Sequence, residues 1–211
     1  SKARDRTIAG TCLYKLGIAW GKVHEYEQTI ETLQRFRRSF PENRNASEAG
    51  FEIGRHLMES GKWDEASRHI EQWVKTDSSL RDKNKFLWFA AWAAIGGNDT
   101  ANALRLLEPL TRSGRTLVGD KAMYWKGRVL LRSGDSSRAE EVFHSCLSRY
   151  PYSYYAYLSQ KALENHFDRP TDPTEFTTIT PRDQDPWNRL QEMPNTVSKT
   201  LQPMLDLVLI G

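Results

Sequence analysis

The sequence has no long apolar run and very little cysteine. No stretch approaches the roughly 18 consecutive apolar residues that a membrane-spanning helix needs, so we expect no membrane span in these 211 residues. The two cysteines, Cys12 and Cys146, say little about the redox compartment. The chain starts at Ser1 without a secretory leader, which is compatible with a cytosolic protein or with a trimmed one.

Motifs for common enzyme chemistries are missing as well. The five histidines are scattered, with none of the H-x-x-x-H or C-x-x-C spacings that bind metal ions. There is no G-x-S-x-G nucleophile elbow, and the glycines of residues 17–22 lack the Ser or Thr that follows the lysine of a phosphate loop. We therefore expect no cofactor, no metal and no catalytic residue, so the chain as given is not predicted to be an enzyme.

Charge of either sign is not in excess, because the formal net charge is only +3. The densest basic spot holds Arg35, Arg37 and Arg38. The last two fall late on a predicted helix, where cations interact favourably with the negative end of the helix dipole. No recognised nucleic-acid-binding module accompanies this charge, so we expect no nucleic-acid partner.

What the sequence does contain is a repeat. Three columns of similar residues advance by 37, 37 and then 36 positions. They are an aromatic column (Tyr14, Phe51, Trp88, Tyr124), a small column (Gly17, Gly54, Ala91, Gly127) and a second, mostly small column (Thr29, Ala66, Ala103, Ala139). A period near 34 residues is typical of stacked helix-turn-helix units. We predict an all-α fold, a right-handed α-solenoid of tetratricopeptide-like repeats.

The repeat also predicts the domain organisation. Residues 1–166 should form a superhelix of four repeats and the start of a fifth, with a first helix over about Thr11–Gly21. Prolines recur through residues 167–195, which we predict to be an extended connector. Residues 196–211 should begin a further helical unit, and their apolar end (LDLVLI) leads us to expect that it is truncated.

The fourth repeat runs into a distinctive stretch. It reads Y-W-x-G-R at residues 124–128, then a G…A turn, then Y-P-x-S-Y-Y-x-x-L at residues 150–158. Over about residues 120–158 this order resembles the superhelical region that precedes the catalytic domain of soluble lytic murein transglycosylases. The resemblance implies a periplasmic protein beside peptidoglycan, with the superhelix as a scaffold and partner-binding arm.

The resemblance does not extend to catalysis. That family cleaves with one glutamate in a Glu-Ser context, followed by a G-L-M-Q motif. Here the Glu-Ser pair is Glu59-Ser60 at a predicted helix end, and no G-L-M-Q occurs. We therefore predict a noncatalytic scaffold that binds a protein partner or peptidoglycan, with any cleavage belonging to a domain beyond Gly211. The alternative is a free-standing tetratricopeptide adaptor, cytoplasmic, with a protein partner and no role at the cell wall.

First-helix residues four positions apart share a face, and in such repeats this face tends to line a groove. The candidates for ligand binding are Tyr14, Phe51, Arg55, Trp88, Trp92, Tyr124, Trp125 and Arg128. Aromatic rings beside arginines suit sugars and carboxylates. The alternative interpretation, which we favour for the rings, is that they pack between adjacent repeats.

Overall fold

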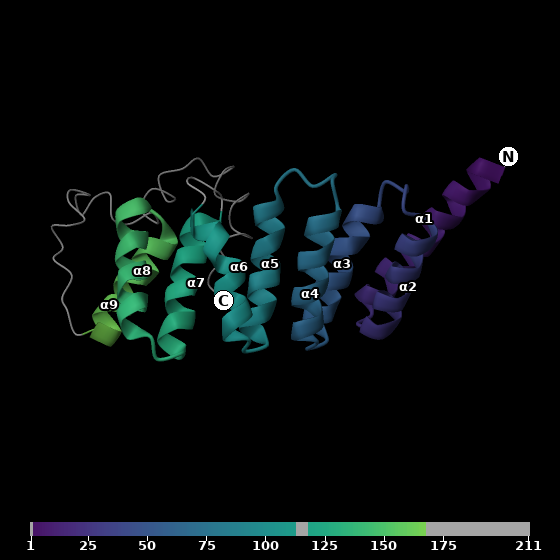
Figure 1. Cartoon of the computed structure of the whole chain (residues 1–211). Coiled ribbons are helices and arrows are strands. Elements are labelled where there is room, and N and C mark those ends of the chain that lie inside the picture. Colours follow the sequence, from purple (N-terminus) through teal and green to yellow (C-terminus); the bar gives the residue numbers. More distant parts are fainter. Residues whose placement is uncertain (1, 113–117, 168–211) are drawn as a thin grey trace, which may run out of the picture. The chain divides into compact units, whose positions relative to one another are not determined.

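The computed structural model describes residues 2–112 and 118–167, and these residues form nine α-helices and no strand. The helices are α1 (Lys2–Lys22), α2 (Tyr26–Ser39), α3 (Ala46–Glu59), α4 (Trp63–Thr76), α5 (Lys83–Gly96), α6 (Thr100–Arg112), α7 (Gly119–Arg132), α8 (Ser136–Arg149) and α9 (Tyr154–Phe167). Figure 1 shows them following one another along a row. The predicted connector and final helical unit lie outside the described residues, except for Phe167, which ends α9.

The helices form successive hairpins. Helix α1 packs on α2, α3 on α4, α5 on α6 and α7 on α8, and each hairpin packs on the next, while α9 contacts both α7 and α8. Each second helix buries one apolar stripe, as α4 does with Ala66, Ile70, Trp73 and Val74. This spacing places the buried side chains on one side of a helix. The predicted α-solenoid of helical repeats is confirmed for the part of the chain that the structure describes.

The small-residue column marks the places where the two helices of a unit cross most closely. A Cβ atom added at Gly54 would lie 2.3 Å from the side chain of Ile70, and one added at Gly127 would lie 2.5 Å from Phe143. Neither distance is possible for a real carbon contact. The missing side chain therefore allows the two helix axes to approach to the close end of the range for packed helices.

A fourth column appears in the structure, in the turns between the paired helices. His24, Gly61, Asn98 and Gly134 all have positive φ angles, of 61°, 76°, 59° and 83°. One residue further on, the backbone N–H reaches back to a carbonyl five residues earlier, as in the 2.9 Å bond from Lys62 to Leu57. This is the hydrogen bond of a Schellman helix end, which needs a left-handed residue. Glycine adopts that conformation without strain, whereas His24 does so at a cost.

Both cysteines are free thiols in the structure. Cys12 is exposed on α1, whereas Cys146 is buried on α8. Its Sγ atom lies 3.6 Å from the carbonyl oxygen of Asp120. Burial raises the pKa of the Cys146 thiol, so it stays protonated and behaves as a small apolar side chain of the fourth unit.

Candidate binding face

The eight candidate residues lie on the first helices of the four units. Helices α1, α3, α5 and α7 carry them in this order: Tyr14; Phe51 and Arg55; Trp88 and Trp92; Tyr124, Trp125 and Arg128. Ring contacts connect the residues on α5 and α7 with one another. Tyr14 on α1 and both Phe51 and Arg55 on α3 contact other side chains instead.

Rings of the aromatic column pack against neighbouring rings. Trp88 and Tyr124 are each only 6% exposed. The ring of Phe51 lies 5.0 Å from that of Phe89 in the next unit, and Tyr124 lies 6.1 Å from Phe143 in its own unit, measured between centroids. Separations of this size are normal for packed aromatic pairs. This column therefore contributes to the core between and within repeats.

Tyr14 is also engaged in packing. Its ring centroid lies 5.4 Å from that of Phe36 on α2. Burial, together with a hydrogen bond to the Glu48 carboxylate on α3, raises the pKa of the Tyr14 hydroxyl. The hydroxyl therefore stays protonated and joins α1 to α3.

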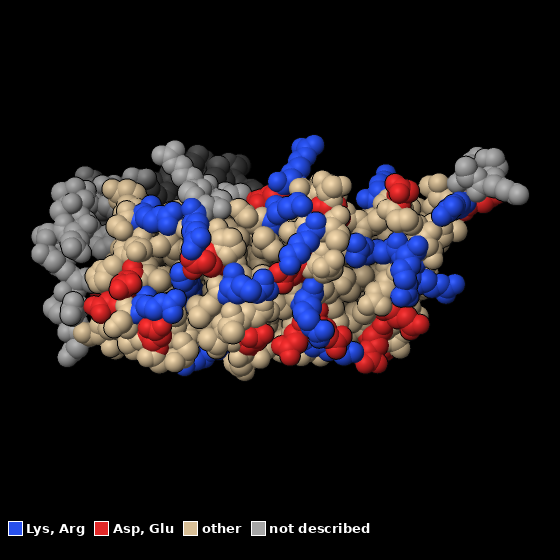
Figure 2. Space-filling view, in the orientation of Figure 1, with Lys and Arg blue, Asp and Glu red and all other residues tan. Residues whose placement is uncertain are grey.

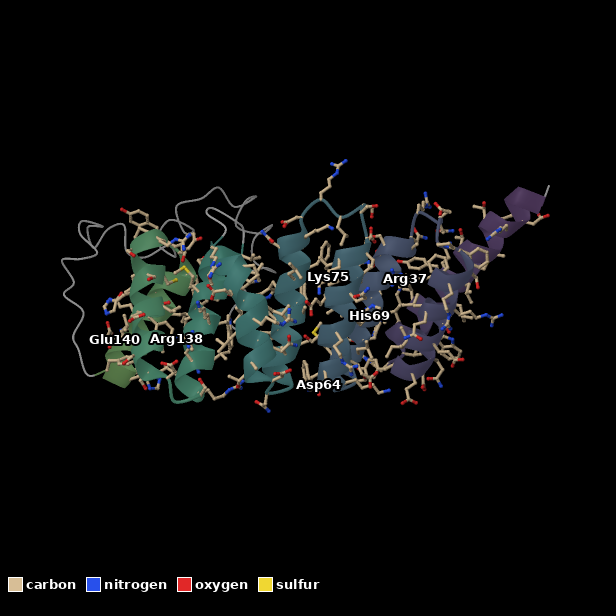
Figure 3. The ribbon with its side chains drawn as sticks, viewed as in Figure 1. Arg37, Asp64, His69, Lys75, Arg138 and Glu140 are labelled. Carbon is tan, nitrogen blue, oxygen red and sulfur yellow. The ribbon has the colours of Figure 1, made fainter. Side chains whose placement is uncertain are left out.

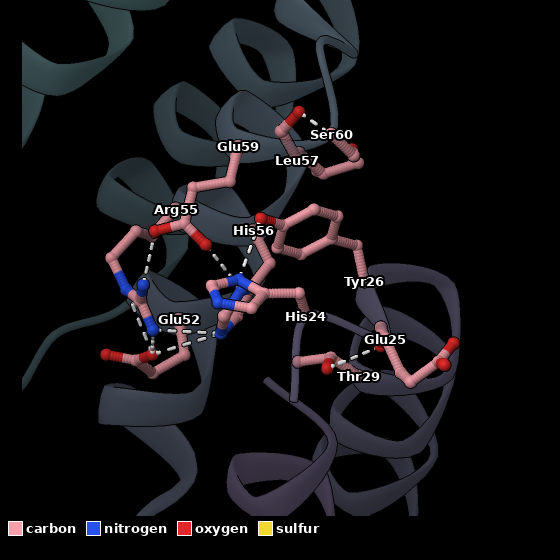
Figure 4. A network of polar contacts seen from close by, with 10 residues as sticks. All are labelled: His24, Glu25, Tyr26, Thr29, Glu52, Arg55, His56, Leu57, Glu59 and Ser60. Carbon is pink, nitrogen blue, oxygen red and sulfur yellow. Dashed lines mark hydrogen bonds and ion pairs between the residues drawn. The ribbon is translucent and has the colours of Figure 1, made fainter. Parts of the chain in front are cut away.

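Arg55 lies on the same helix as two carboxylates that neutralise it. Its guanidinium donates hydrogen bonds to Glu52 at 2.5 Å and to Glu59, and the contact with Glu59 is very short. It also donates to Nε2 of His56 at 2.8 Å, so this nitrogen is the acceptor and the ring proton is on Nδ1, which faces Glu59. Figure 4 shows the four side chains as one network. Arg55 has little capacity left for a ligand.

The Glu-Ser pair belongs to this same network. Glu59 pairs with Arg55 and His56, and the Ser60 hydroxyl donates to the Leu57 carbonyl at 3.0 Å. Both side chains are thus held by helix α3 itself. These contacts identify Glu59 and Ser60 as the end of helix α3, where Glu59 forms ion pairs.

Aromatic rings form a continuous chain across the later units. The ring centroids of Trp88 and Trp92 are 6.0 Å apart, those of Trp92 and Trp125 4.8 Å, and those of Trp125 and Tyr124 5.6 Å. Tyr124 in turn lies 5.8 Å from Tyr155 on α9. Within this chain Trp92 is 37% exposed. The chain of rings therefore links α5, α7 and α9 and leaves part of the Trp92 ring exposed.

A cavity of about 440 Å³ lies beside these rings. It is bounded by α5, α7, the start of α8 and the end of α9, and its lining residues are Ile95, Trp125, Arg128, Val129, Leu131, Arg132, Ser136 and His166. Two arginines and a histidine face it, and its described lining contains no carboxylate. Such a composition favours an anionic group that also has apolar surface.

Arg128 contributes an exposed guanidinium next to the chain of rings. It donates one hydrogen bond, at 2.7 Å, to the hydroxyl of Tyr124 one turn earlier. Within residues 2–112 and 118–167 it has no carboxylate partner. One arm of the planar fork is therefore held by a neutral oxygen, and the remaining N–H groups are free to bind a carboxylate from outside.

Apart from Trp125 and Arg128, the residues that line the cavity were not among the candidates, and three of these are polar. Arg132 lies one turn after Arg128 on α7, so its place on the same face follows from helical spacing and was overlooked. Ser136 starts α8, and His166 comes from the far end of α9. Only the stacking of the fifth unit onto the fourth brings His166 to α7, and no local pattern in the sequence indicates that.

The described residues offer neither a metal site nor a membrane-spanning helix. These contain no group of three or more His, Cys, Asp or Glu side chains arranged to hold a metal ion. None of the nine described helices is long and apolar enough to cross a membrane.

Two family models match the sequence, and both describe a tetratricopeptide repeat, one over residues 11–43 and the other over residues 90–154. The chain carries tetratricopeptide repeats. No curated protein matches it in sequence. The matched ranges include most of the first unit and all of α6, α7 and α8, whereas residues 44–89 lie outside both.

Solved structures resemble the chain in fold. MamA protein aligns with a TM-score of 0.55 at 19% identity, over 74% of this chain and 81% of its own. A tetratricopeptide repeat protein of Parabacteroides merdae aligns with a TM-score of 0.57 at 19% identity, over 74% of this chain and 59% of its own. Identities this low establish the fold alone. Nothing in these matches points to lytic transglycosylases, and that resemblance stays a prediction.

Proposed function

We propose that these tetratricopeptide repeats are a protein-interaction scaffold, and that the cavity beside α7 binds a carboxylate-bearing segment of the partner. The observation that carries the proposal is the pair Arg128 and Arg132 beside the Trp125 ring, with no acid in the described lining. Solenoid repeats present extended surfaces suited to such segments. The fold supports this class of function, and the lining residues of the cavity support the choice of this site.

The chemistry of the cavity suits an acidic residue next to an apolar one. Arg128 has free N–H groups for a bidentate contact with a carboxylate, and Arg132 adds a second positive charge to the same face. Trp125 and Ile95 supply the apolar part of the lining. Such anchors usually contribute most of the binding energy of an interface.

The test is to select binders from a displayed random peptide library on the immobilised protein, then measure each with variants. We expect Arg128→Ala to weaken the selected peptides about 10-fold or more, as the loss of a charged hydrogen bond implies. Arg138→Ala is the matched control, because Arg138 is an exposed arginine on α8 outside the cavity. Equal affinities for Arg128→Ala and wild type would remove the cavity from the binding site.

A second candidate is a scaffold at the bacterial cell wall, in the periplasm, that binds peptidoglycan. One observation favours it. The residues that carry the resemblance to soluble lytic transglycosylases, Tyr124, Trp125, Arg128 and Tyr155, converge from α7 and α9 on one place. Exposed Trp92 beside them offers a ring for a sugar.

Sedimentation with insoluble peptidoglycan sacculi separates the two candidates. Tyr124→Ala is a poor probe, because this side chain is buried and its removal would leave a cavity in the core. Trp92→Ala combined with Arg128→Ala alters exposed groups instead. Loss of sedimentation in this variant with an unchanged melting temperature would favour the cell-wall scaffold. Failure of the wild type to sediment would leave the protein-binding adaptor.

A further inference from the structure

Arg37, on the second helix of the first unit, has an unusual environment. Its side chain is half-buried, yet none of its five N–H groups has a hydrogen-bond partner within residues 2–112 and 118–167. Removing a charged group from water without a partner is unfavourable. A guanidinium in this state is well suited to a ligand that supplies the missing acceptors.

The nearest acid does not fill this role. Asp77 attracts Arg37, but both of its carboxylate oxygens are already occupied. One accepts from the Trp73 indole at 3.0 Å, and the other accepts from the Ser79 backbone N–H at 2.9 Å and hydroxyl at 2.6 Å. Burial lowers the pKa of Arg37 and the attraction of Asp77 only partly offsets this, so desolvation is the larger effect.

Two cavities meet at Arg37. One, of about 380 Å³, lies between α2 and α4 and is lined by Gln34, Arg37, Leu57, Glu65, Arg68, His69, Gln72, Trp73 and Thr76. The other, of about 740 Å³, continues past the ends of these helices and adds Arg38 and Arg44 together with the acids Glu42 and Asp77. Lys and Arg side chains gather over this part of the molecule (Figure 2), where Arg37 lies beside His69 (Figure 3).

His69 does not compete for an anion. Its Nε2 donates to the Gly50 carbonyl at 2.8 Å. Burial, and to a smaller extent the nearby charge of Arg37, lower the pKa of His69, so the ring is neutral near pH 7. Around Arg37 the fixed charges are therefore Arg38, Arg44 and Arg68 against Glu42, Glu65 and Asp77. These cancel in number and leave Arg37 as the uncompensated charge.

We infer that the cleft between α2 and α4 is a second binding site, in which Arg37 forms a bidentate pair with one carboxylate of an acidic peptide segment from a protein partner. A planar guanidinium matches a carboxylate of single charge. The nearby acids repel a phosphate group, which brings two charges to one point, more than a peptide segment that brings a single carboxylate there. Gln34, Gln72 and Thr76 supply neutral donors and acceptors for the peptide backbone.

This site is separate from the one proposed on the later units. Its residues belong to α2, α3 and α4, the α2–α3 connection and the segment after α4, whereas Arg128 and Arg132 belong to α7. The two sites are therefore tested independently. An Arg128→Ala/Arg132→Ala protein is used as the background, so that the cavity beside α7 does not contribute to binding.

The test measures fluorescein-labelled hexaglutamate by anisotropy at physiological ionic strength, where screening weakens long-range attraction. Arg37→Met keeps the apolar stem of the side chain and removes the charge. Arg35→Met is the control, because it makes the same charge change on the same helix at an exposed residue that does not line either cavity. We expect Arg37→Met to weaken binding at least about 10-fold, and Arg35→Met to leave it within twofold.

Three results would overturn the assignment. They are absence of binding by the background protein, equal weakening by both variants, and tighter Arg37-dependent binding of inorganic phosphate than of hexaglutamate. Melting temperature gives an independent check without ligand. Because Arg37 lacks hydrogen-bond partners, Arg37→Met should melt at the same temperature or higher, whereas a structural arginine would give a clear decrease.

Discussion

Helices α3 and α7 occupy equivalent places in the second and fourth units, yet their arginines have opposite environments. Arg55 and Arg128 each follow the aromatic column by four residues. Glu52 and Glu59 pair with Arg55. The equivalent positions around Arg128 hold Trp125 and Arg132, so only a tyrosine hydroxyl contacts that guanidinium.

The difference shows that position in a repeat does not decide whether a residue is free to bind. Side chains three and four positions away on a helix are neighbours, and they determine what charge remains. In α3 the neighbouring carboxylates pair with Arg55, so its charge is not available to a ligand. In α7 the neighbours of Arg128 are the Trp125 ring and a second cation, Arg132. The end of α9 contributes His166 to the cavity that these residues line.

The largest effect is expected when a methyl group is added where the two helices of each unit cross. Gly54→Ala and Gly127→Ala introduce a Cβ at 2.3 Å from Ile70 and at 2.5 Å from Phe143. Overpacking of this kind costs about 1–3 kcal/mol, and each solenoid unit is supported only by its neighbours. We expect lower urea midpoints for both variants, with faster hydrogen exchange in α3–α4 for the first and in α7–α8 for the second.

The control for this pair is Ser137→Ala, a small change at an exposed position of α8. It should leave both measurements unchanged. An unaltered midpoint in Gly127→Ala would mean that the helices of the fourth unit separate without loss, contrary to the close crossing. Exchange that speeds up equally in all units would contradict the local character of the repeats.

The helices could be predicted from the sequence more completely than the candidate site. Columns of small and aromatic residues identified the repeat and every hairpin, because the packing contacts that select these residues occur once in each repeat. The start of α1 was predicted wrongly at Thr11, whereas the helix begins at Lys2. Ile8, in this first part, is 53% exposed, so no apolar stripe marks these turns.

The candidate site was less predictable, for a physical reason. All eight candidates were chosen from the aromatic column and its neighbours, but the ring packing between helices is a property of the assembled units. Glu52 lies three positions before Arg55 and Glu59 four positions after it. This spacing alone indicates that both carboxylates can pair with Arg55. The free guanidinium of Arg37 depends on Asp77 being occupied by Trp73 and Ser79, which only the folded chain reveals.

A smaller change should make α7 resemble α3. Arg132→Glu places a carboxylate one turn after Arg128, where Glu59 follows Arg55. We expect selected peptides to bind about 10-fold more weakly, because the introduced carboxylate pairs with Arg128 and the positive charge of Arg132 is lost. Arg132→Gln, which only removes a charge, should have a smaller effect in the same titration. Equal effects of the two variants would mean that Arg128 is not the principal contact.

The smallest expected effect concerns pH and again separates the two helices. His56 on α3 is nearly fully buried, whereas its equivalent on α7 is Val129. Burial, followed by the charge of Arg55, lowers the pKa of His56 below its ordinary value of 6.5, and the nearby Glu59 and Glu52 only partly offset this. The unfolded chain therefore binds a proton more readily than the native chain as the pH falls below 6.5.

The contribution of His56 to stability is fully present above pH 6.5 and is lost as the pH falls toward the lowered pKa. Urea midpoints should therefore decrease slightly between pH 7 and pH 5.5, and exchange in α3 should increase before exchange in α7. Glu71 does not titrate in this window, since Arg105 lowers its pKa to about 2. His56→Gln should reduce the decrease without abolishing it, because burial also lowers the pKa of His69 on α4. An unchanged slope in that variant would assign the pH dependence to His69 or to another group.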